Sequence, residues 1–356
     1  MGNRSRALVI ALGIFFIGIA ALAKFYAYPT LAVAPADQVA QTVSTGTDAT
    51  IFSVKELREK TGVSLEARRT VRGDVAAAKK ISEALDRDVV VFDTAVVTDD
   101  SVDYKFPDDA SKTDEMPLSF VQERVVLDAR TGEAVRWAGE NEQDNSGEYI
   151  TTTLKKEDRL KPKDGDPYFQ GHQGLVLKFP FGTEKKTYQF WDTSTRKAYP
   201  IQYKGEDKLY GLNVYVFEQE VPKQDIPQAK PLMVPPAVIK ETGTDAVAVQ
   251  RSYQNKRTLW IEPTTGAIIK GQEEQLASLS YNGEPRVTAT KVLIKYDDAT
   301  VKKNVDGVKG SDEGNYKAKA AQLTLIGFWV PLISLIIGLL LLGLVLVLSL
   351  RPRRTV

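Results

Sequence analysis

Two long apolar runs lie near the ends of the sequence, and the stretch between them mixes polar and apolar residues. Residues 7–23 and residues 323–350 contain no charged side chain. A helix needs roughly 20 apolar residues to cross the hydrocarbon core of a bilayer, which is about 30 Å thick. The second run exceeds this length, and the first reaches it when extended to residue 28. The pattern therefore predicts transmembrane helices over 7–28 and 323–350.

The first run also has the features of a secretory signal peptide. Arg4 and Arg6 precede it, and Ala21-Leu22-Ala23 has the small-x-small form of a cleavage site. An uncleaved anchor and a cleaved signal peptide are therefore both open interpretations. Either one sends the stretch that follows to the outside of the plasma membrane.

Basic residues flank the outer ends of both runs. Arginines precede the first run within residues 1–6 and follow the second run within residues 351–356. Lysine and arginine close to a membrane span tend to stay in the cytoplasm. We therefore expect a plasma-membrane protein with short cytoplasmic tails at 1–6 and 351–356 and an extracytoplasmic middle.

Between the runs, the dominant pattern is an alternation of apolar and polar residues with period two, which is typical of half-buried strands. Residues 76–85 have helical spacing instead. We expect a mainly β (α+β) domain over residues 51–300, with a curled antiparallel sheet or distorted barrel. The candidate strands are residues 63–73, 88–99, 119–129, 185–192, 197–205, 212–221, 257–263, 267–281 and 286–297.

Three other segments lack this alternation. Residues 29–50 are small and polar and are interpreted as a linker that leaves the membrane. Residues 301–322 are charged and contain glycines, which favours a second linker that returns to it. Residues 222–250 are rich in proline and carry an apolar patch, so a lid, a partner contact and an ordered loop are all open interpretations.

Two short turns share the same chemistry. Asp128 opens the first turn and Gly132 closes it, and Glu262 and Gly266 take the same places in the second. An acidic residue at the start and a glycine at the end favour a type I turn that ends in a left-handed residue and forms a G1 bulge between paired strands. We predict a structural role for both glycines.

The charge balance bears on the class of partner. The chain has 47 Lys and Arg against 46 Asp and Glu. Residues 1–30 and 323–356 hold six of the basic residues and none of the acidic ones, which leaves 41 basic and 46 acidic residues in the middle. Because a nucleic-acid-binding protein needs a basic surplus to neutralise phosphates, this balance argues against a nucleic acid partner.

The residues that usually carry catalysis are scarce. The absence of cysteine excludes disulfides, thiolate metal sites and cysteine nucleophiles. The one histidine, His172, lies between glycines, and no G-x-S-x-G motif supplies a serine nucleophile, so we interpret His172 as incidental. The acidic clusters lack the spacing of a calcium loop. We expect a protein that is not an enzyme and has no metal and no cofactor.

Aromatic side chains are concentrated in residues 178–203. One interpretation is ordinary core and cross-strand packing. The other is an apolar cavity that holds a ligand such as a lipid, since barrels and curled sheets enclose cavities of this kind. The candidate ligand-binding residues are Phe179, Phe181, Tyr188, Phe190, Trp191, Tyr215 and Phe217.

Several of these segments resemble a known family. Residues 179–188 (FPFGTEKKTY), 190–192 (FWD), 215–217 (YVF) and 259–263 (LWIEP) are similar to the porin PorA-like family of actinobacterial envelope proteins. The resemblance covers essentially the whole chain. It implies a place in the cell envelope of a Gram-positive bacterium, and it carries over no catalytic residue.

The two apolar runs give the chain an architecture similar to that of class B scavenger receptors, which have a span at each end and a β-rich ectodomain with a lipid tunnel. An outer-membrane barrel crosses its membrane with strands and has no long apolar helix. The run at 323–350 therefore favours the plasma membrane.

The leading hypothesis is a doubly anchored, non-enzymatic envelope protein whose ectodomain binds or conducts hydrophobic ligands such as envelope lipids. Its expected partners are membrane lipids and a protein of the envelope. One alternative is a scaffold or accessory subunit of an envelope transporter or synthase. Another is a porin-like channel.

Overall fold

The computed structural model describes residues 3–53, 56–100, 104–112, 116–141, 144–154, 159–163, 168–226, 232–308 and 313–350. The chain divides into two compact units. The helical unit comprises residues 1–33 and 317–356, and the β domain comprises residues 34–316. The C-terminal tail that sequence analysis places in the cytoplasm, residues 351–356, lies outside the described residues.

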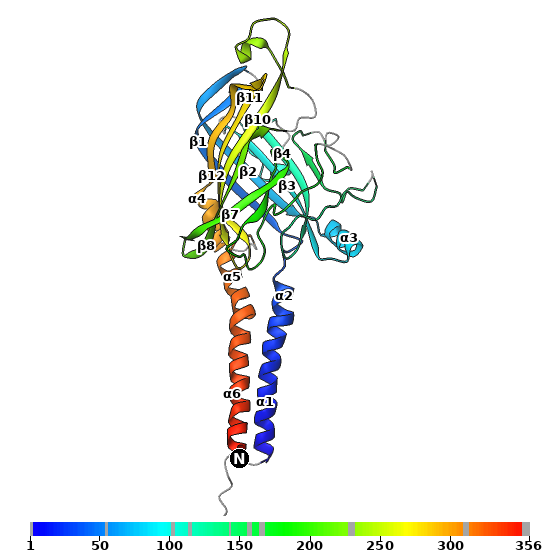
Figure 1. Ribbon diagram of the computed structural model, residues 1–356, viewed down its shortest axis with the longest axis vertical. Helices are drawn as coiled ribbons and strands as arrows, with labels where there is room; N and C mark the ends of the chain where they lie inside the picture. Colours follow the sequence, from blue (N-terminus) through cyan, green and yellow to red (C-terminus); the bar gives the residue numbers. More distant parts are fainter. Residues whose placement is uncertain are drawn as a thin grey trace, which may run out of the picture. The chain divides into compact units, whose positions relative to one another are not determined.

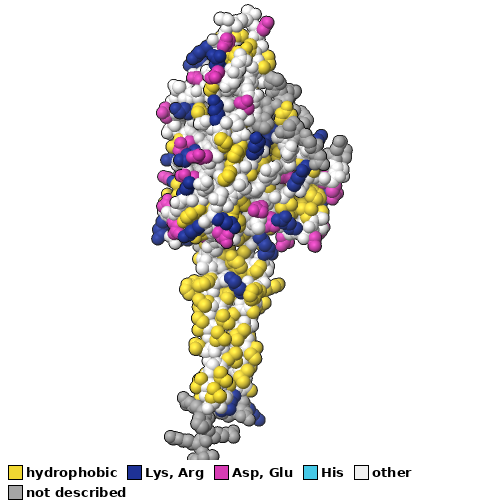
Figure 2. Space-filling model, in the orientation of Figure 1, with side chains coloured by type: hydrophobic (Ala, Val, Ile, Leu, Met, Phe, Trp, Pro, Cys, Tyr) yellow, Lys and Arg dark blue, Asp and Glu magenta, His cyan; other side chains and the backbone are white. Residues whose placement is uncertain are grey.

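The helical unit is built from two long helices with apolar side chains along their length (Figure 2). By length and composition, Arg4–Leu31 and Tyr316–Leu350 are each able to cross a membrane. Each contains one short π-helical segment. The elements are α1 (Asn3–Leu22), η1 (Ala23–Ala27), α2 (Tyr28–Leu31), α5 (Tyr316–Thr324), η5 (Leu325–Trp329) and α6 (Val330–Leu350).

Glycines bring α1 and α6 into close contact. A Cβ added at Gly338 would lie 2.8 Å from the Gly13 carbonyl oxygen and 2.7 Å from a side-chain carbon of Ile17. A Cβ added at Gly327 would lie 2.4 Å from the ring of Tyr28. Small residues allow helix backbones to approach closely in a membrane, where apolar side chains gain little from leaving the lipid. The two helices therefore pack as a pair.

The β domain is an antiparallel sheet that curls into a half-barrel (Figure 1). Among the described residues the strand order is β5-β4-β3-β2-β1-β12-β11-β10-β8-β7-β6, and β9 pairs with β10. The strands are β1 (Val39–Ser53), β2 (Arg58–Gly73), β3 (Val89–Asp99), β4 (Ser119–Asp128), β5 (Tyr149–Thr151), β6 (Tyr188–Asp192), β7 (Lys197–Leu209), β8 (Leu212–Asp225), β9 (Leu232–Val234), β10 (Val247–Glu262), β11 (Ala267–Tyr281) and β12 (Glu284–Tyr296). The predicted fold class, a mainly β domain with an apolar helix at either end, is confirmed.

Two helices lie against the sheet. Helix α3 (Val75–Leu85) begins at Asp74, whose carboxylate accepts a hydrogen bond from the Ala77 amide at 3.0 Å, and packs on β3 through Ile81. Helix α4 (Asp298–Asp306) is capped in the same way by Asp297 and packs on β8 and β11. Short 3-10 turns occur at η2 (Ala110–Lys112) and η4 (Pro236–Ile239).

Irregular pairing bends the strands. In β1 the register shifts between Gly46 and Thr50, and Asp48 takes a left-handed backbone conformation with φ of 56°. A Cβ at Gly46 would lie 2.6 Å from Val292 of the neighbouring strand. The curl goes so far that residues near opposite edges of the sheet touch, since Glu123 of β4 accepts a hydrogen bond from the indole of Trp191 in β6 at 3.4 Å.

The predicted linkers differ from the structure. Residues 39–50 form most of β1, which lies at the centre of the sheet. Its inward side chains include Thr42 and Ser44, so the apolar signal of a strand is missing. Within 301–322, the structure shows the end of α4 and the start of α5. Residues 39–50 and the described parts of α4 and α5 are therefore regular elements, where the sequence predicts linkers.

The two turns agree with their prediction. Gly132 and Gly266 have φ angles of 72° and 73°, which is the left-handed region. A Cβ at Gly266 would lie 2.0 Å from the Phe179 carbonyl oxygen. The acidic residue that opens each turn accepts backbone hydrogen bonds from within it, at 2.7 Å from the Thr131 amide to Asp128 and 2.7 Å from the Thr265 amide to Glu262.

Candidate functional site

A cavity of about 490 Å³ lies inside the curl of the β domain. Its walls come from both arms of the sheet, from β1 to β4 on one side and from β6 and β9 to β12 on the other. Ligand pockets typically have volumes of about 300–1,000 Å³. The cavity is therefore large enough for a small organic molecule or part of a lipid.

Much of the cavity wall is apolar, and many of its side chains are small. Alternate residues of neighbouring strands face inward, as period-two geometry requires. Leu65 and Ala67 come from β2, Val96 from β3, Val121 from β4 and Ala277 from β11. Because these side chains do not meet across the curl, the space between them stays open.

Exposed apolar side chains also line part of the cavity. Leu57, Leu118, Leu232 and Met233 are each between 40% and 53% exposed and belong to the cavity lining. We call these four residues the apolar rim. The apolar rim gives the cavity lining an exposed apolar surface that a hydrophobic ligand can contact.

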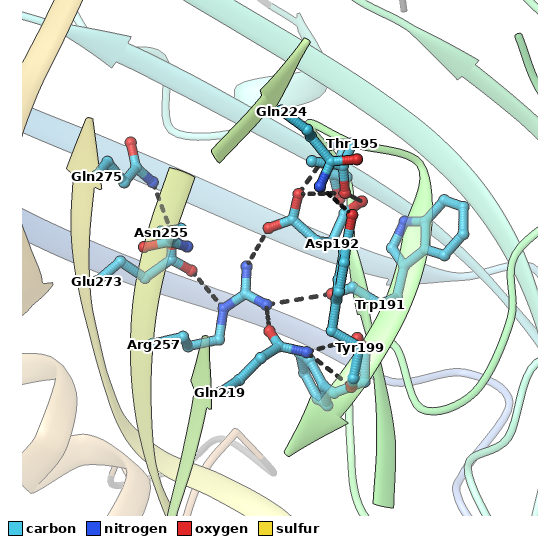
Figure 3. Close-up of polar contacts among 12 residues, drawn as sticks. Trp191, Asp192, Thr195, Tyr199, Gln219, Gln224, Asn255, Arg257, Glu273 and Gln275 are labelled. Atoms are coloured by element: carbon cyan, nitrogen blue, oxygen red, sulfur yellow. Dashed lines mark hydrogen bonds and ion pairs between the residues drawn. The ribbon is translucent and has the colours of Figure 1, made fainter. Parts of the chain in front are cut away.

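A buried polar network lies at the other end of the cavity, centred on Arg257 of β10 (Figure 3). The Arg257 Nε donates to the Glu273 carboxylate at 2.8 Å, and the guanidinium also donates to Asp192 at 3.2 Å. A further guanidinium nitrogen donates to the Trp191 carbonyl oxygen at 3.2 Å and to the Gln219 side chain. The charge is thus paired and hydrogen-bonded, as burial requires.

Neighbouring side chains satisfy the two carboxylates of this network. Asn255 donates to Glu273 at 3.0 Å and Gln275 donates to it at 2.6 Å. Asp192 accepts from the Thr195 amide at 2.9 Å and from the Thr195 hydroxyl at 3.0 Å. The network is therefore a connected unit whose members hold one another in place.

Burial and charge act in opposite directions on these groups. Burial alone would raise the pKa of Glu273, but the charge and hydrogen bond of Arg257 hold that pKa at about 2. For Asp192, burial is the larger effect and raises the pKa of the carboxyl above its ordinary value, although Arg257 opposes it. Burial lowers the pKa of Arg257 less than the two carboxylates raise it, so Arg257 stays charged.

A second buried cluster contains His172. Its Nδ1 lies 2.8 Å from Glu148 and its Nε2 lies 3.4 Å from Glu123, and the ring packs against Phe169 and Trp191. Burial favours the neutral imidazole, yet the hydrogen bonds to the two glutamates raise the pKa of His172 to about 9. His172 looks incidental in the sequence, whereas in the structure it is a charged link between two carboxylates.

Two further arginines line the cavity. Arg69 of β2 lies close enough to Glu123 and Glu273 for its charge to stabilise both carboxylates. Arg251 of β10 makes no ion pair with any acidic residue in the described part of the chain. The lining also includes Thr94, which is 4% exposed and whose hydroxyl has no hydrogen-bond partner among the described residues.

The structure separates the aromatic candidates that the sequence suggested. Phe190 and Trp191 line the cavity, and the other five do not. Phe179, Phe190 and Phe217 pack together in a closed cluster with four aliphatic side chains, against which Tyr188 and Tyr215 also pack. Phe181 lies under the ammonium group of Lys178, at 4.2 Å from Nζ to the ring centroid. Ligand binding by these residues stays a prediction.

The polar residues of the cavity escaped the sequence analysis, although the sequence contains a signal for them. Along β10, Arg251, Tyr253, Asn255 and Arg257 are at alternate positions, in phase with the buried Leu259. Four polar residues on the side of the strand that also carries the buried Leu259 indicate that the interior is polar there. In the described part of the chain, no group of three or more histidines and carboxylates is arranged to hold a metal ion.

Comparison with known proteins finds relatives that share the same name. Two are called Porin PorA: one from Corynebacterium amycolatum is 26% identical over 205 residues, and one from Corynebacterium resistens is 30% identical over 145 residues. These matches cover 47% and 28% of this chain and 51% and 35% of the relatives. The chain thus spans about half, or less, of the length of the curated relatives it matches.

Solved structures give only weak likenesses. One is a DUF1329 family protein from Desulfovibrio piger, with 9% identity and a TM-score of 0.23 over 82% of this chain and 91% of that one. Another is described as an outer membrane lipoprotein-sorting protein domain from Vibrio parahaemolyticus, with 9% identity and a TM-score of 0.21 over 82% of this chain and 98% of that one. Scores near 0.2 do not establish a shared fold.

The family model covers almost the whole sequence. It is described as Porin PorA and matches residues 6–347, including most of both apolar helices and the entire β domain. The predicted resemblance is thereby confirmed, and the chain belongs to the Porin PorA family.

Proposed function

We propose that the β domain binds hydrophobic or amphipathic molecules, such as envelope lipids, in its cavity without converting them. The two apolar helices hold the chain in the plasma membrane, with both termini in the cytoplasm and the β domain outside. The observation that carries the proposal is the cavity itself, about 490 Å³ in volume, whose lining includes many apolar side chains and the apolar rim.

Part of the cavity wall is apolar and leaves room for a ligand. The inward side chains of β2 and β11 include Ala67 and Ala277, which leave space where a filled core would have large side chains. Empty apolar space forfeits packing contacts, and an apolar ligand restores them. The exposed side chains of the apolar rim gain in the same way when a ligand covers them.

Lipid extraction from the intact protein tests the proposal. The full chain is taken from membranes in a detergent-free polymer disc, and the lipids that co-purify are compared by mass spectrometry with those of empty discs. Ala67→Phe places a large side chain in the cavity, and Ala76→Phe places the same side chain on the exposed face of α3.

We expect a specific lipid to be enriched with the wild-type chain and with Ala76→Phe, and to be lost with Ala67→Phe. Equal lipid content in all three samples and in empty discs would contradict the proposal. A protein partner that co-purifies in fixed ratio, with no enriched lipid, would instead favour a scaffold.

A channel is the second candidate, and the names of the relatives favour it. The charged side chains around Arg257 also resemble the lining of a polar passage. The test is current across a planar bilayer that contains the full chain. Stepwise conductance that Ala67→Phe reduces and Ala76→Phe leaves unchanged would support a channel through the cavity.

A further inference from the structure

We propose that the ligand of the cavity is an anionic amphiphile, whose acidic headgroup binds to Arg251 while its hydrocarbon part lies against the apolar wall. This inference rests on the proposed function and names the class of ligand. It follows from the placement of charge inside the cavity, which is uneven.

The charges that line the cavity are balanced in number. They are Arg69, Arg251 and Arg257 against Glu123, Asp192 and Glu273. Asp192 and Glu273 pair with Arg257, and Glu123 lies against His172. Arg69 is close enough to Glu123 and Glu273 to interact electrostatically with both carboxylates. Arg251 is the remaining cation, and its ion-pair partner is missing among the described residues.

Arg251 is one of the residues that line the cavity. Its neighbours two residues away on β10 are the buried Val249 and Tyr253, and its partner across the sheet is the buried Leu279. Its own side chain is exposed, yet the surrounding protein lowers the pKa of the guanidinium by desolvation. Both observations fit a side chain that is exposed to the cavity and crowded by its walls.

Such a cation benefits from an anionic ligand. Arginine stays protonated under physiological conditions even when its pKa falls, so the charge persists. A cation that has no counter-ion and is crowded by protein walls is stabilised by a carboxylate or phosphate that pairs with it. The guanidinium fork also donates two parallel hydrogen bonds to either group, which an alcohol or ester cannot match.

The position of Arg251 assigns an orientation to the ligand. Strand β9 pairs Leu232 with Val249, so the apolar rim lies two residues along β10 from Arg251. Arg257 lies six residues further along β10, which at about 3.4 Å per residue is roughly 20 Å away. The headgroup therefore binds near the apolar rim, and the chain extends over Ala277 and the inward residues of neighbouring strands.

A binding comparison on the full chain tests this inference. The protein is placed in discs of a zwitterionic lipid, and palmitate, hexadecyl phosphate, hexadecanol and inorganic phosphate compete with a fluorescent fatty acid, with empty discs as the blank. The variants are Arg251→Gln, Arg251→Lys and, as a matched control, Lys256→Gln, which removes a charge from the exposed face of the same strand.

We expect palmitate and hexadecyl phosphate to bind the wild-type chain about tenfold more tightly than hexadecanol, because a charge-assisted hydrogen bond is worth at least that factor. Inorganic phosphate is expected to bind too weakly to compete. Arg251→Gln should abolish the preference for acids and leave hexadecanol binding unchanged, and Arg251→Lys should retain part of it. Lys256→Gln should behave as the wild type.

The outcomes separate this inference from the proposed function. If the wild type binds hexadecanol as tightly as palmitate, the anionic headgroup is wrong and a hydrophobic ligand stands. If inorganic phosphate competes as well as hexadecyl phosphate, the site binds an anion and not an amphiphile. If none of the long-chain compounds binds, the proposed function itself fails. The wild-type comparison needs no variant, so a misfolded Arg251→Gln does not prevent the test.

Discussion

The buried cluster around Phe179, Phe190 and Phe217, called here the aromatic core, and the cavity occupy neighbouring parts of one sheet. They differ in whether side chains fill the space. In the aromatic core, the ring centroid of Phe179 lies 4.8 Å from that of Phe217 and 5.8 Å from that of Phe190. Phe179 and Phe217 are fully buried. In the cavity, the inward positions hold residues such as Ala67 and Ala277. Leu259 belongs to both regions.

The difference shows how a curled sheet keeps a space open. Large rings from β6, β8 and the segment before β6 meet on one arm of the sheet, so they fill the interior there and stabilise it through burial and ring contacts. Small side chains leave space between them, and the charged residues around Arg257 that line this space pair with one another. The density of aromatic residues therefore marks the closed part of the interior, and the polar and small residues mark the open part.

The largest expected effect on stability comes from disrupting the network around Arg257 at the polar end of the cavity. Arg257→Met removes the cation that Asp192 and Glu273 share and leaves two carboxylates unpaired in a desolvated site. We expect the free energy of unfolding to fall by about 3–5 kcal/mol. Denaturant unfolding of the full chain, followed by far-ultraviolet circular dichroism, measures it.

A triple variant is the control for that experiment. Replacing both carboxylates with amides in the Arg257→Met background, as Asp192→Asn and Glu273→Gln, should recover much of the lost stability. A loss below about 1 kcal/mol in the single variant would show that water reaches these carboxylates and that the network is not desolvated.

Phe217→Ala should cost a similar amount, about 3–5 kcal/mol, since it empties a site in the aromatic core. It should leave ligand binding in the cavity unchanged, because Phe217 does not line it. The same unfolding measurement and the lipid extraction assay check both parts. A variant that loses lipid while remaining folded would show that the two regions are coupled.

The His172 cluster predicts a dependence of stability on pH. The pKa of His172 is raised from 6.5 to about 9 in the folded state, so its stabilising effect is complete below pH 6.5 and is lost as the pH rises through 9. The shift corresponds to about 3 kcal/mol. Lys178 acts in the opposite sense, because burial lowers its pKa to about 7, and stability rises with pH from there towards 10.5.

For this reason the quantity to measure is the difference in unfolding free energy between the wild type and His172→Gln at each pH. That difference should shrink by about 3 kcal/mol between pH 6 and pH 10, whatever Lys178 contributes to both proteins. A difference that stays constant over this range would mean that His172 is neutral in the folded protein.

The smallest stability effect is expected from filling the cavity. Ala67→Phe should change the unfolding free energy by less than about 1 kcal/mol, since open space receives the ring. Ala95→Phe, at a position 1% exposed on the neighbouring strand, should cost about 1–3 kcal/mol by overpacking. Equal costs for the two substitutions would show that the cavity is closed in solution.

Much of the scaffold could be predicted from the sequence. The period-two pattern locates most strands, and the acidic residue and glycine of the two turns predict the left-handed conformation found at Gly132 and Gly266. The pattern does not reveal strand β1 because residues such as Thr42 and Ser44 face a cavity and not a core. Alternation reveals a strand only where one of its faces is apolar.

The candidate site was harder to predict for a related reason. Its charged residues come from strands far apart in the sequence, as with Arg69, Glu123 and Arg257, and only the curl of the sheet brings them together. For a single residue such as His172, the neighbouring residues in the sequence do not indicate which side chains it contacts. The aromatic residues are conspicuous in the sequence, but the structure assigns most of them to the closed core.

The pairing of β1 with β12 has a consequence for how the protein is made. Strands β1–β5 and β6–β12 are two consecutive halves of the chain, and the seam between them joins the first strand to the last, as where Ser44 pairs with Tyr296. Contacts this distant in sequence form slowly, and each half carries an unpaired strand edge until they do. Because the cavity takes residues from both halves, it exists only after the seam has closed. A ligand that bound there would stabilise the joined state by mass action, so its binding would favour completion of the fold.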